Sequence, residues 1–179
     1  MIRHFLTFCL LIFFLFLNCY KSDFSQRSPN RWKERLKAEE VLREAAINNN
    51  TLAARDLLSH IRIFLGTPHK MGGTTVSGVD CSGLVKTVFE KSLEIELPHN
   101  TTLLFNQTKP VQVQQAQLGD LVFFSSPKEK SVSHVGIYLH DNKFVHASSV
   151  NGVTVSNLKK VYYRKRFRGV RRVANINLK

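Results

Sequence analysis

Apolar residues recur at helical spacing in the part of the chain that begins at residue 30. Residues 30–46 mix charged residues with an apolar series, and residues 51–66 repeat the period through Leu58 and Ile61. Each segment is predicted to be an amphipathic helix, and Gly66 is a typical residue to end the second one. The apolar face predicted for the first helix comprises Trp32, Leu36, Leu42 and Ala46.

A third helical segment begins at Asp80 and reads "DCSGLVKTVF". Aspartate is a favoured N-cap residue, so Cys81 is predicted to lie in the first turn of this helix. The segment before it, residues 67–78, is rich in Gly, Thr and Ser and is predicted to form a loop.

The second half of the chain changes to the alternation that is typical of strands. Residues 120–126, 133–140, 143–149 and 152–158 are four such segments, separated by short polar breaks. Helices followed by an antiparallel meander predict an α+β fold, in which the helix that carries Cys81 packs on the sheet.

Two histidines fall at related positions on this predicted sheet. If residues 140–142 form a three-residue turn, Gly136 pairs with His146, and His134 and His146 share one face as diagonal neighbours. A glycine opposite His146 would leave room for the two rings to meet. A two-residue turn would send the rings to opposite faces, so the prediction depends on the register.

The N-terminus carries an apolar segment of 13 residues, from residue 5 to residue 17, in which Thr7 is the one polar residue. A membrane-spanning helix needs about 20 such residues, and a secretory signal segment needs fewer, so we expect export. The sequence "LFLNC" at the end of the run resembles the lipobox of bacterial lipoproteins, although Phe16 and Asn18 depart from it. Cys19 is therefore the lipidation candidate, and an uncleaved anchor or an unrecognised cleavage site is the alternative.

Export would leave Cys81 as the one cysteine of the mature domain, with no internal partner for a disulfide. An unpaired thiol is a liability in an oxidising compartment, which favours a reactive role. The start of a helix and a nearby imidazolium would both lower the thiol pKa from its usual value of about 8.5. His134 would then be the base, and His146 would hold the second nitrogen of its ring.

The motifs "DCSGLV", "LGDLVFF", "SHVGIYL" and "FVHASS", in this order, resemble the NlpC-type cysteine peptidases, which are cell-wall endopeptidases with a papain-like core. The resemblance covers residues 58–173. It implies that Cys81 is the nucleophile, His134 the base and His146 the orienting third residue. It also implies cleavage of peptidoglycan stem peptides, typically between γ-D-glutamate and a diamino acid such as meso-diaminopimelate, without a cofactor.

The resemblance also points to residues around the nucleophile. Asp80 and Ser82 are candidates to line the substrate groove, although capping the helix is the favoured role for Asp80, and the N–H of Cys81 or a neighbour would bind the oxyanion. His69 stands where the family usually has a tyrosine close to the substrate, and its imidazole could donate a hydrogen bond there. His99 replaces an arginine whose role is more often structural. The loss of the tyrosine leaves a rival interpretation open, a catalytically silent cell-wall-binding or scaffold lipoprotein with the same fold.

The charge balance is strongly basic, with 26 Lys and Arg against 13 Asp and Glu, and many of the cations lie in "KKVYYRKRFRGVRR". Export argues against nucleic acid as a partner. An anionic envelope surface is the favoured partner, and a solvated basic strand is the alternative. A zinc site formed by Cys81, His134 and His146 is a further possibility, but no CxxC or HxxxH spacing supports it.

These observations divide the chain into four parts. Residues 1–19 would be the signal or lipobox-like segment, 20–30 a tether, 31–57 an N-terminal helical region and 58–175 the peptidase domain. The protein is predicted to be a monomer in the cell envelope, on its periplasmic or outer-membrane face, attached to the membrane through an N-terminal lipid or anchor.

Overall fold

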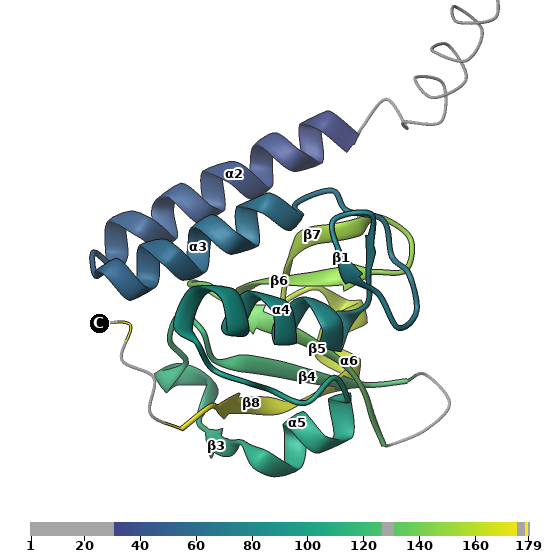
Figure 1. Cartoon of the computed structure of the whole chain (residues 1–179). Coiled ribbons are helices and arrows are strands. Elements are labelled where there is room, and N and C mark those ends of the chain that lie inside the picture. Colours follow the sequence, from purple (N-terminus) through teal and green to yellow (C-terminus); the bar gives the residue numbers. More distant parts are fainter. Residues whose placement is uncertain (1–30, 127–130, 175–177, 179) are drawn as a thin grey trace, which may run out of the picture. The chain divides into compact units, whose positions relative to one another are not determined.

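The computed structural model describes residues 31–126, 131–174 and 178 (Figure 1). The predicted signal segment, the tether and the lipidation candidate Cys19 lie outside the described residues. Residues 34–179 form one compact unit. The described elements are, in order, α2 (Arg31–Asn48), α3 (Leu52–Phe64), β1 (Thr74–Thr75), β2 (Gly78–Val79), α4 (Cys81–Leu93), α5 (Thr101–Gln107), β3 (Lys109–Val111), the 3-10 turn η1 (Val113–Gln115), β4 (Leu121–Ser125), β5 (Val132–Tyr138), β6 (Lys143–Ser148), β7 (Gly152–Asn157), α6 (Val161–Arg166) and β8 (Phe167–Arg172).

The helix α3 forms as the sequence predicts. Thr51 caps its start, because the Thr51 side chain accepts a hydrogen bond from the N–H of Ala54. Leu58 and Ile61 are buried, and Gly66 follows the helix with a left-handed φ of 82°. No helix within the described residues is long and apolar enough to cross a membrane.

The face predicted for α2 is wrong in part. Leu36, and Trp32 before it, are each 59% exposed, whereas Ala38, Leu42 and Ala45 are buried. The buried positions follow the i, i+4, i+7 spacing of one helix face, and two of them are alanines too small to stand out in a hydrophobicity pattern. The ion pair between Arg62 of α3 and Glu39 of α2, at 2.7 Å, holds the two helices together.

The six-stranded sheet has the strand order β3-β8-β4-β5-β6-β7, and its recorded strand pairs are antiparallel. The predicted meander from β4 to β7 is confirmed, and so is the α+β class. The chain returns at its end to insert β8 between β3 and β4, which the local pattern could not reveal. The segment predicted as a loop, residues 67–78, also contains the short hairpin β1–β2.

Helices cover both faces of this sheet. On one face, α4 buries the four apolar residues that its pattern predicted, Leu84, Val85, Val88 and Phe89, in the cluster that holds Val135 and Ile137 of β5. On the other face, Tyr138 and Phe144 pack with residues of α6 and β8, in a second cluster. Because side chains alternate along β5, His134 belongs with Tyr138 on this second face.

The register between β5 and β6 is the predicted one. Ile137 pairs with Val145, and Tyr138 pairs with Phe144, so the same register sets Gly136 against His146. A Cβ atom added at Gly136 would lie 3.2 Å from the Cβ of His146 and 2.8 Å from the carbonyl oxygen of Val145. The nearest atom would be Cδ2 of Phe144, at 2.7 Å, so the absence of a side chain at Gly136 makes room for the Phe144 ring and for the close approach of β6.

Candidate active site

Cys81 is the first residue of α4, as predicted. The Asp80 carboxylate accepts a 2.7 Å hydrogen bond from the N–H of Gly83, which is the hydrogen bond expected of an N-cap. The chain extends through Asp80 and turns into the helix at Cys81. The thiol is therefore carried on a rigid element at the point where the chain enters the core.

The sheet opens next to this helix start. Within the described residues, β5 and β6 pair at Ile137 and Tyr138, whereas the β4–β5 pairing continues back to Val132. The N–H of Val135 donates a hydrogen bond to the Cys81 sulfur. The Cys81 thiol therefore contacts β5 at Val135, the residue after His134, where β5 is no longer paired with β6.

Thr101 is a second neighbour of the sulfur. Its Oγ1 atom lies 3.7 Å from Cys81 Sγ, and it comes from the start of α5. The sequence gives no signal for this contact, because 20 residues separate the two positions and only the packing of α5 brings them together.

The two predicted histidines meet. Nε2 of His134 and Nδ1 of His146 are 2.8 Å apart, and the rings stand nearly perpendicular, with an angle of 88° between their planes. Nδ1 of His134 is therefore the ring nitrogen that His146 leaves free for other chemistry. The opening between the two strands is bridged by this side-chain hydrogen bond.

Two hydroxyl groups that sequence reasoning missed lie behind His146. Its Nε2 atom is 3.1 Å from Ser156 Oγ and 3.1 Å from Tyr163 Oη. Ser156 is on β7, diagonal to His146 on the same face, so the β6–β7 register could have indicated it. Tyr163 comes from α6, and no local pattern links it to the histidines.

Burial dominates the electrostatics of these groups. It raises the pKa of the Cys81 thiol, against the opposing effect of the Val135 N–H and the Thr101 hydroxyl. The expectation of a lowered thiol pKa is therefore wrong, because the desolvation of the thiolate outweighs the helix start. Burial, followed by the positive charge of His69, lowers the pKa of His134 to about 4.

His146 shifts in the same direction. Burial, then the charges of His134 and Lys160, lower its pKa well below the usual 6.5. Near neutral pH, the site therefore holds a protonated thiol and two neutral imidazoles. His146 can orient His134 through a hydrogen bond, but it supplies no counter-charge.

Asp80 also organises the loops around the helix start. Its oxygens lie 2.7 Å from the Gly72 nitrogen, 3.0 Å from Ser82 Oγ and 2.9 Å from His99 Nε2. Burial alone would raise the pKa of Asp80, but the N–H of Gly83 and the His99 ring hold it below its usual value. The Asp80 and Ser82 side chains thus bind each other and neighbouring groups, and His99 ties its loop to the helix.

His69 lies at the edge of this arrangement. It forms a bridge with Val79, just before the helix, and its side chain is half-buried. The electrostatic effect of His69 on His134 shows that the two side chains belong to the same part of the molecule.

We expect Gly83→Ala to destabilise the helix start. A Cβ atom at Gly83 would lie 2.1 Å from the carbonyl oxygen of Gly73, which accepts the hydrogen bond from the N–H of Asp80. Forcing the two segments apart should cost about 1–3 kcal/mol of the free energy of unfolding. Urea denaturation measures this loss, with Lys91→Ala on the exposed face of α4 as the control; equal stability of the two variants would contradict the close packing.

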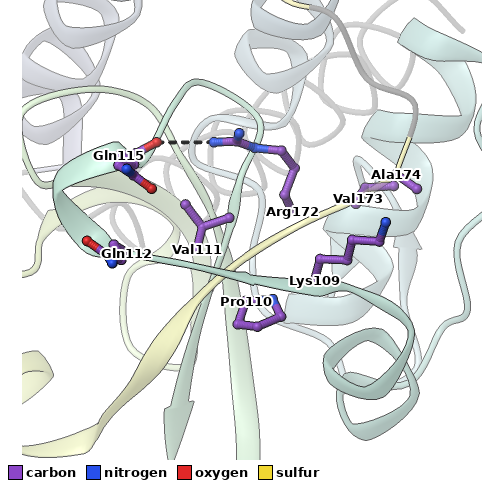
Figure 2. A pocket seen from close by; sticks show the side chains of 8 residues that line it. All are labelled: Lys109, Pro110, Val111, Gln112, Gln115, Arg172, Val173 and Ala174. Atoms are coloured by element: carbon purple, nitrogen blue, oxygen red, sulfur yellow. Dashed lines mark hydrogen bonds between the residues drawn. The ribbon is translucent and has the colours of Figure 1, made fainter.

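A cavity of about 510 Å³ lies elsewhere, at the β3 and β8 edge of the sheet (Figure 2). It is lined by β3, by Gln112 and Gln115, and by residues 172–174. Arg172 donates to the Gln115 carbonyl oxygen at 3.1 Å and forms an ion pair with Asp120 at 2.7 Å. Its charge is thus already compensated, and none of the predicted site residues lines this cavity.

Metal binding is not indicated by the geometry. In the part of the chain that the structure describes, no group of three or more His, Cys, Asp or Glu side chains is arranged to hold a metal ion. The site is an array of one thiol, two imidazoles and neighbouring hydroxyls.

Comparisons with known proteins agree with this architecture. Residues 66–172 match the model of the NlpC/P60 family. A "probable endopeptidase" of Haemophilus influenzae is 41% identical over 108 residues, which are 60% of this chain and 67% of that protein. The "murein DD-endopeptidase MepS/murein LD-carboxypeptidase" of Escherichia coli K12 is 39% identical over 108 residues, again 60% of this chain and 56% of that protein.

A solved structure from Staphylococcus aureus, described as similar to a lipoprotein of the NLP/P60 family, has a TM-score of 0.64 and 31% identity. The match covers 69% of this chain and 42% of that one. The chain therefore spans about half to two thirds of the two curated relatives and less than half of this structure.

Proposed function

Because the chain belongs to the NlpC/P60 family, a family of cysteine peptidases, we propose that it is an endopeptidase that hydrolyses amide bonds in peptidoglycan stem peptides. The observation that carries the proposal is the thiol at the start of α4, which accepts a hydrogen bond from the N–H of Val135, the residue after His134 on β5, together with the 2.8 Å pair of histidines. The names of both curated relatives support an endopeptidase, and the name of the Escherichia coli relative, a murein endopeptidase, supports the substrate class.

The neutral state of the site suggests general-base catalysis rather than a preformed ion pair. Nδ1 of His134 takes the thiol proton as the Cys81 sulfur attacks the carbonyl carbon of the stem peptide. The negative charge moves to the carbonyl oxygen, where the N–H of Cys81 at the helix start stabilises it. The buried thiol is therefore activated only when a carbonyl is present to receive the sulfur.

Collapse of the tetrahedral intermediate then breaks the amide bond. The imidazolium of His134 gives its proton to the leaving amine, and the acyl group stays on Cys81 as a thioester. A water molecule, deprotonated by His134, attacks the thioester and releases the new carboxylate, and the sulfur recovers its proton. His146 keeps the ring of His134 in place throughout, Asp80 and Ser82 hold the helix start, and His69 contacts the substrate.

The bond that is cut is proposed to be the one between γ-D-glutamate and the diamino acid of the stem. The resemblance of the site motifs to NlpC-type enzymes supports this bond, whereas the name of the Escherichia coli relative specifies a DD-endopeptidase. Digestion of purified sacculi and of defined muropeptides, followed by mass analysis, distinguishes the two bonds. The Cys81→Ala variant is the matched control, and a wild type that releases no fragments would favour a silent wall-binding protein.

The basic end of the chain supports retention on an anionic surface of the envelope. Residues 142–179 contain no Asp or Glu, and Lys159, Arg164 and Lys165, at and before α6, are exposed. Such a cluster attracts polyanions through a field that salt screens. The partner is proposed to be the carboxylate- and phosphate-bearing surface on which the substrate lies.

Neutralising this cluster should weaken retention on the wall. We expect Lys159→Gln/Arg164→Gln/Lys165→Gln, in a Cys81→Ala background, to bind sacculi several-fold less at low salt and to lose most of the salt dependence. Co-sedimentation at increasing NaCl measures both effects. The control, Lys33→Gln/Lys37→Gln/Arg43→Gln on α2, changes the net charge equally; equal loss in both variants would refute a local surface.

Export and membrane attachment are proposed on the N-terminal segment alone. The apolar run and the lipobox-like end support lipidation of Cys19, with the domain in the cell envelope, and the peptidase domain is proposed to comprise residues 58–175. The intact mass of protein extracted from membranes reports the modification. An unmodified Cys19 would exclude the lipoprotein.

A further inference from the structure

We infer that Ser156 and Tyr163 are positioning residues for the catalytic base, because their hydroxyls accept the Nε2 proton of His146 and so leave Nδ1 of His146 free to hold His134. The kinetic part of this inference rests on the proposed peptidase function. The hydrogen-bond assignment itself concerns the resting protein.

The three polar atoms form a compact triangle. His146 Nε2, Ser156 Oγ and Tyr163 Oη are each 3.1 Å from the other two. His146 and Ser156 are buried, with 2% and 8% of their surface exposed, and Tyr163 is half-buried. A buried ring nitrogen must find a partner inside the protein, and these hydroxyls are the partners within reach.

The role proposed for His134 sets the direction of the hydrogen bonds that run from His134 through His146 to the two hydroxyls. For His134 to take a proton on Nδ1, its own proton must lie on Nε2, where it donates to His146 Nδ1 across 2.8 Å. His146 is neutral, so its single ring proton then lies on Nε2 and points at the hydroxyls. Protonation of His146 on Nδ1 would reverse the bond and put a proton on the wrong nitrogen of His134.

The hydroxyl pair can accept the His146 proton without leaving a buried hydroxyl unpaired. When His146 donates, Ser156 accepts from it and donates to Tyr163, so the buried Ser156 hydroxyl uses both of its hydrogen-bonding roles. The hydrogen-bond chain then ends at Tyr163, the more exposed of the two residues. If Tyr163 donated to Ser156 and Ser156 to His146, the same hydroxyls would be satisfied in reverse, so the role of His134 sets the direction and the His146 tautomer tests it.

The surroundings keep both partners in the required state. Burial raises the pKa of Tyr163, so its phenol stays neutral. The ring of Tyr163 packs edge-on against Phe144, with ring centroids 5.0 Å apart. The charge of Lys160, at the start of α6, opposes protonation of His146. The short helix α6 therefore supplies a hydroxyl and a charge that act together on one imidazole.

Removing both hydroxyls should shift the proton of His146. A buried N–H without an acceptor is rarer in proteins than a buried acceptor without a donor. In the Ser156→Ala/Tyr163→Phe variant, the His146 ring should therefore favour a proton on Nδ1. Either hydroxyl alone can still accept, so each single variant should lower kcat only about threefold or less, and the double variant more than about twentyfold, with KM unchanged. The effect of the pair therefore exceeds the product of the single effects.

NMR can locate the ring proton of His146 directly. Long-range proton–nitrogen NMR of the substrate-free protein should place the His146 proton on Nε2 in the wild type and largely on Nδ1 in the double variant. Ser156→Thr in the Tyr163→Phe background keeps one hydroxyl and should restore both the tautomer and kcat. Tyr162→Phe, at a 56% exposed position on the same helix, is the control and should resemble the wild type.

The outcomes separate this inference from the proposed function. A proton on Nδ1 in the wild type, or an unchanged tautomer in a folded double variant, overturns the assignment. If the double variant does not fold, the tautomer of the wild type decides the assignment, because a proton on Nε2 of His146 supports it and a proton on Nδ1 overturns it. A wild type without hydrolytic activity would contradict the peptidase function, and the tautomer would still test the hydroxyl pair.

Discussion

Cys81→Ala is expected to abolish hydrolysis of muropeptides, with a loss of at least about 10⁴-fold in kcat, because no other group in the site can form the thioester. Cys81→Ser should be as inactive, because a hydroxyl is a far weaker nucleophile than a thiol at this position. Product formation followed by mass spectrometry measures both variants. Residual hydrolysis above about one percent of wild type in either variant would contradict covalent catalysis by this residue.

The same two variants show whether Cys81 acts as a reactive thiol or only as a packing residue. Cys81 packs against the edge of the α4 core cluster, so replacement by the smaller alanine removes some buried apolar contact. Serine keeps the size and the contacts with Thr101 and the Val135 N–H. Equal unfolding midpoints for wild type and Cys81→Ser, together with lost activity, therefore identify a chemical role. Because burial raises the thiol pKa, alkylation of the free enzyme should also be slow at neutral pH and accelerate as the pH rises.

Local sequence patterns were sufficient to predict the two elements that carry the proposed nucleophile and the proposed base. The N-cap of α4 follows from the type of one residue, Asp80, and from the apolar spacing behind it. The meeting of His134 and His146 follows from the length of one turn, because a sheet register fixes every side chain on the strand once it is fixed for one pair. Both predictions needed only short-range geometry.

Long-range packing determines the features of the molecule that the sequence patterns did not predict. The sign of the thiol pKa shift depends on how deeply the core buries the sulfur, whereas the sequence showed only that a helix begins there. Thr101 and Tyr163 reach the site from α5 and α6, whose positions are set by tertiary contacts. The exposure of Leu36 on α2 has the same origin, since the alternative face of small residues is the one that the core selects.

Burial also explains how one site can keep a thiol inert and still use it. A thiolate in this environment would be poorly solvated, so the resting protein keeps its proton. An imidazole with a low pKa is a weak base, but it is neutral over a wide range of pH and always ready to accept a proton. In the proposed mechanism, the oxyanion that forms near the helix start provides the favourable charge interaction that the free thiolate lacks. That mechanism ties catalysis to the presence of the substrate carbonyl.

His134→Asn is expected to lower kcat by about 10²–10⁴-fold, because the amide cannot accept the thiol proton. The pH dependence of the wild type identifies the same group. His134 must be neutral to act, and its pKa is about 4, so kcat/KM should stay constant from neutral pH down to about pH 5 and fall below about pH 4. The residual activity of His134→Asn should lack this limb. A wild-type limb near pH 6.5 would contradict the buried, neutral base.

Stability gives a measurement of His134 that does not depend on activity. The folded pKa lies below the usual 6.5, so the stability that His134 contributes is present above pH 6.5 and is lost as the pH falls toward about 4, when the unfolded chain binds the proton first. From that shift, wild type should lose about 3 kcal/mol more of its unfolding free energy between these pH values than His134→Asn. Urea denaturation at several pH values measures the difference. His146 shifts in the same direction and remains in both proteins, so identical slopes would mean that His134 is solvated in the folded protein and would contradict a buried base.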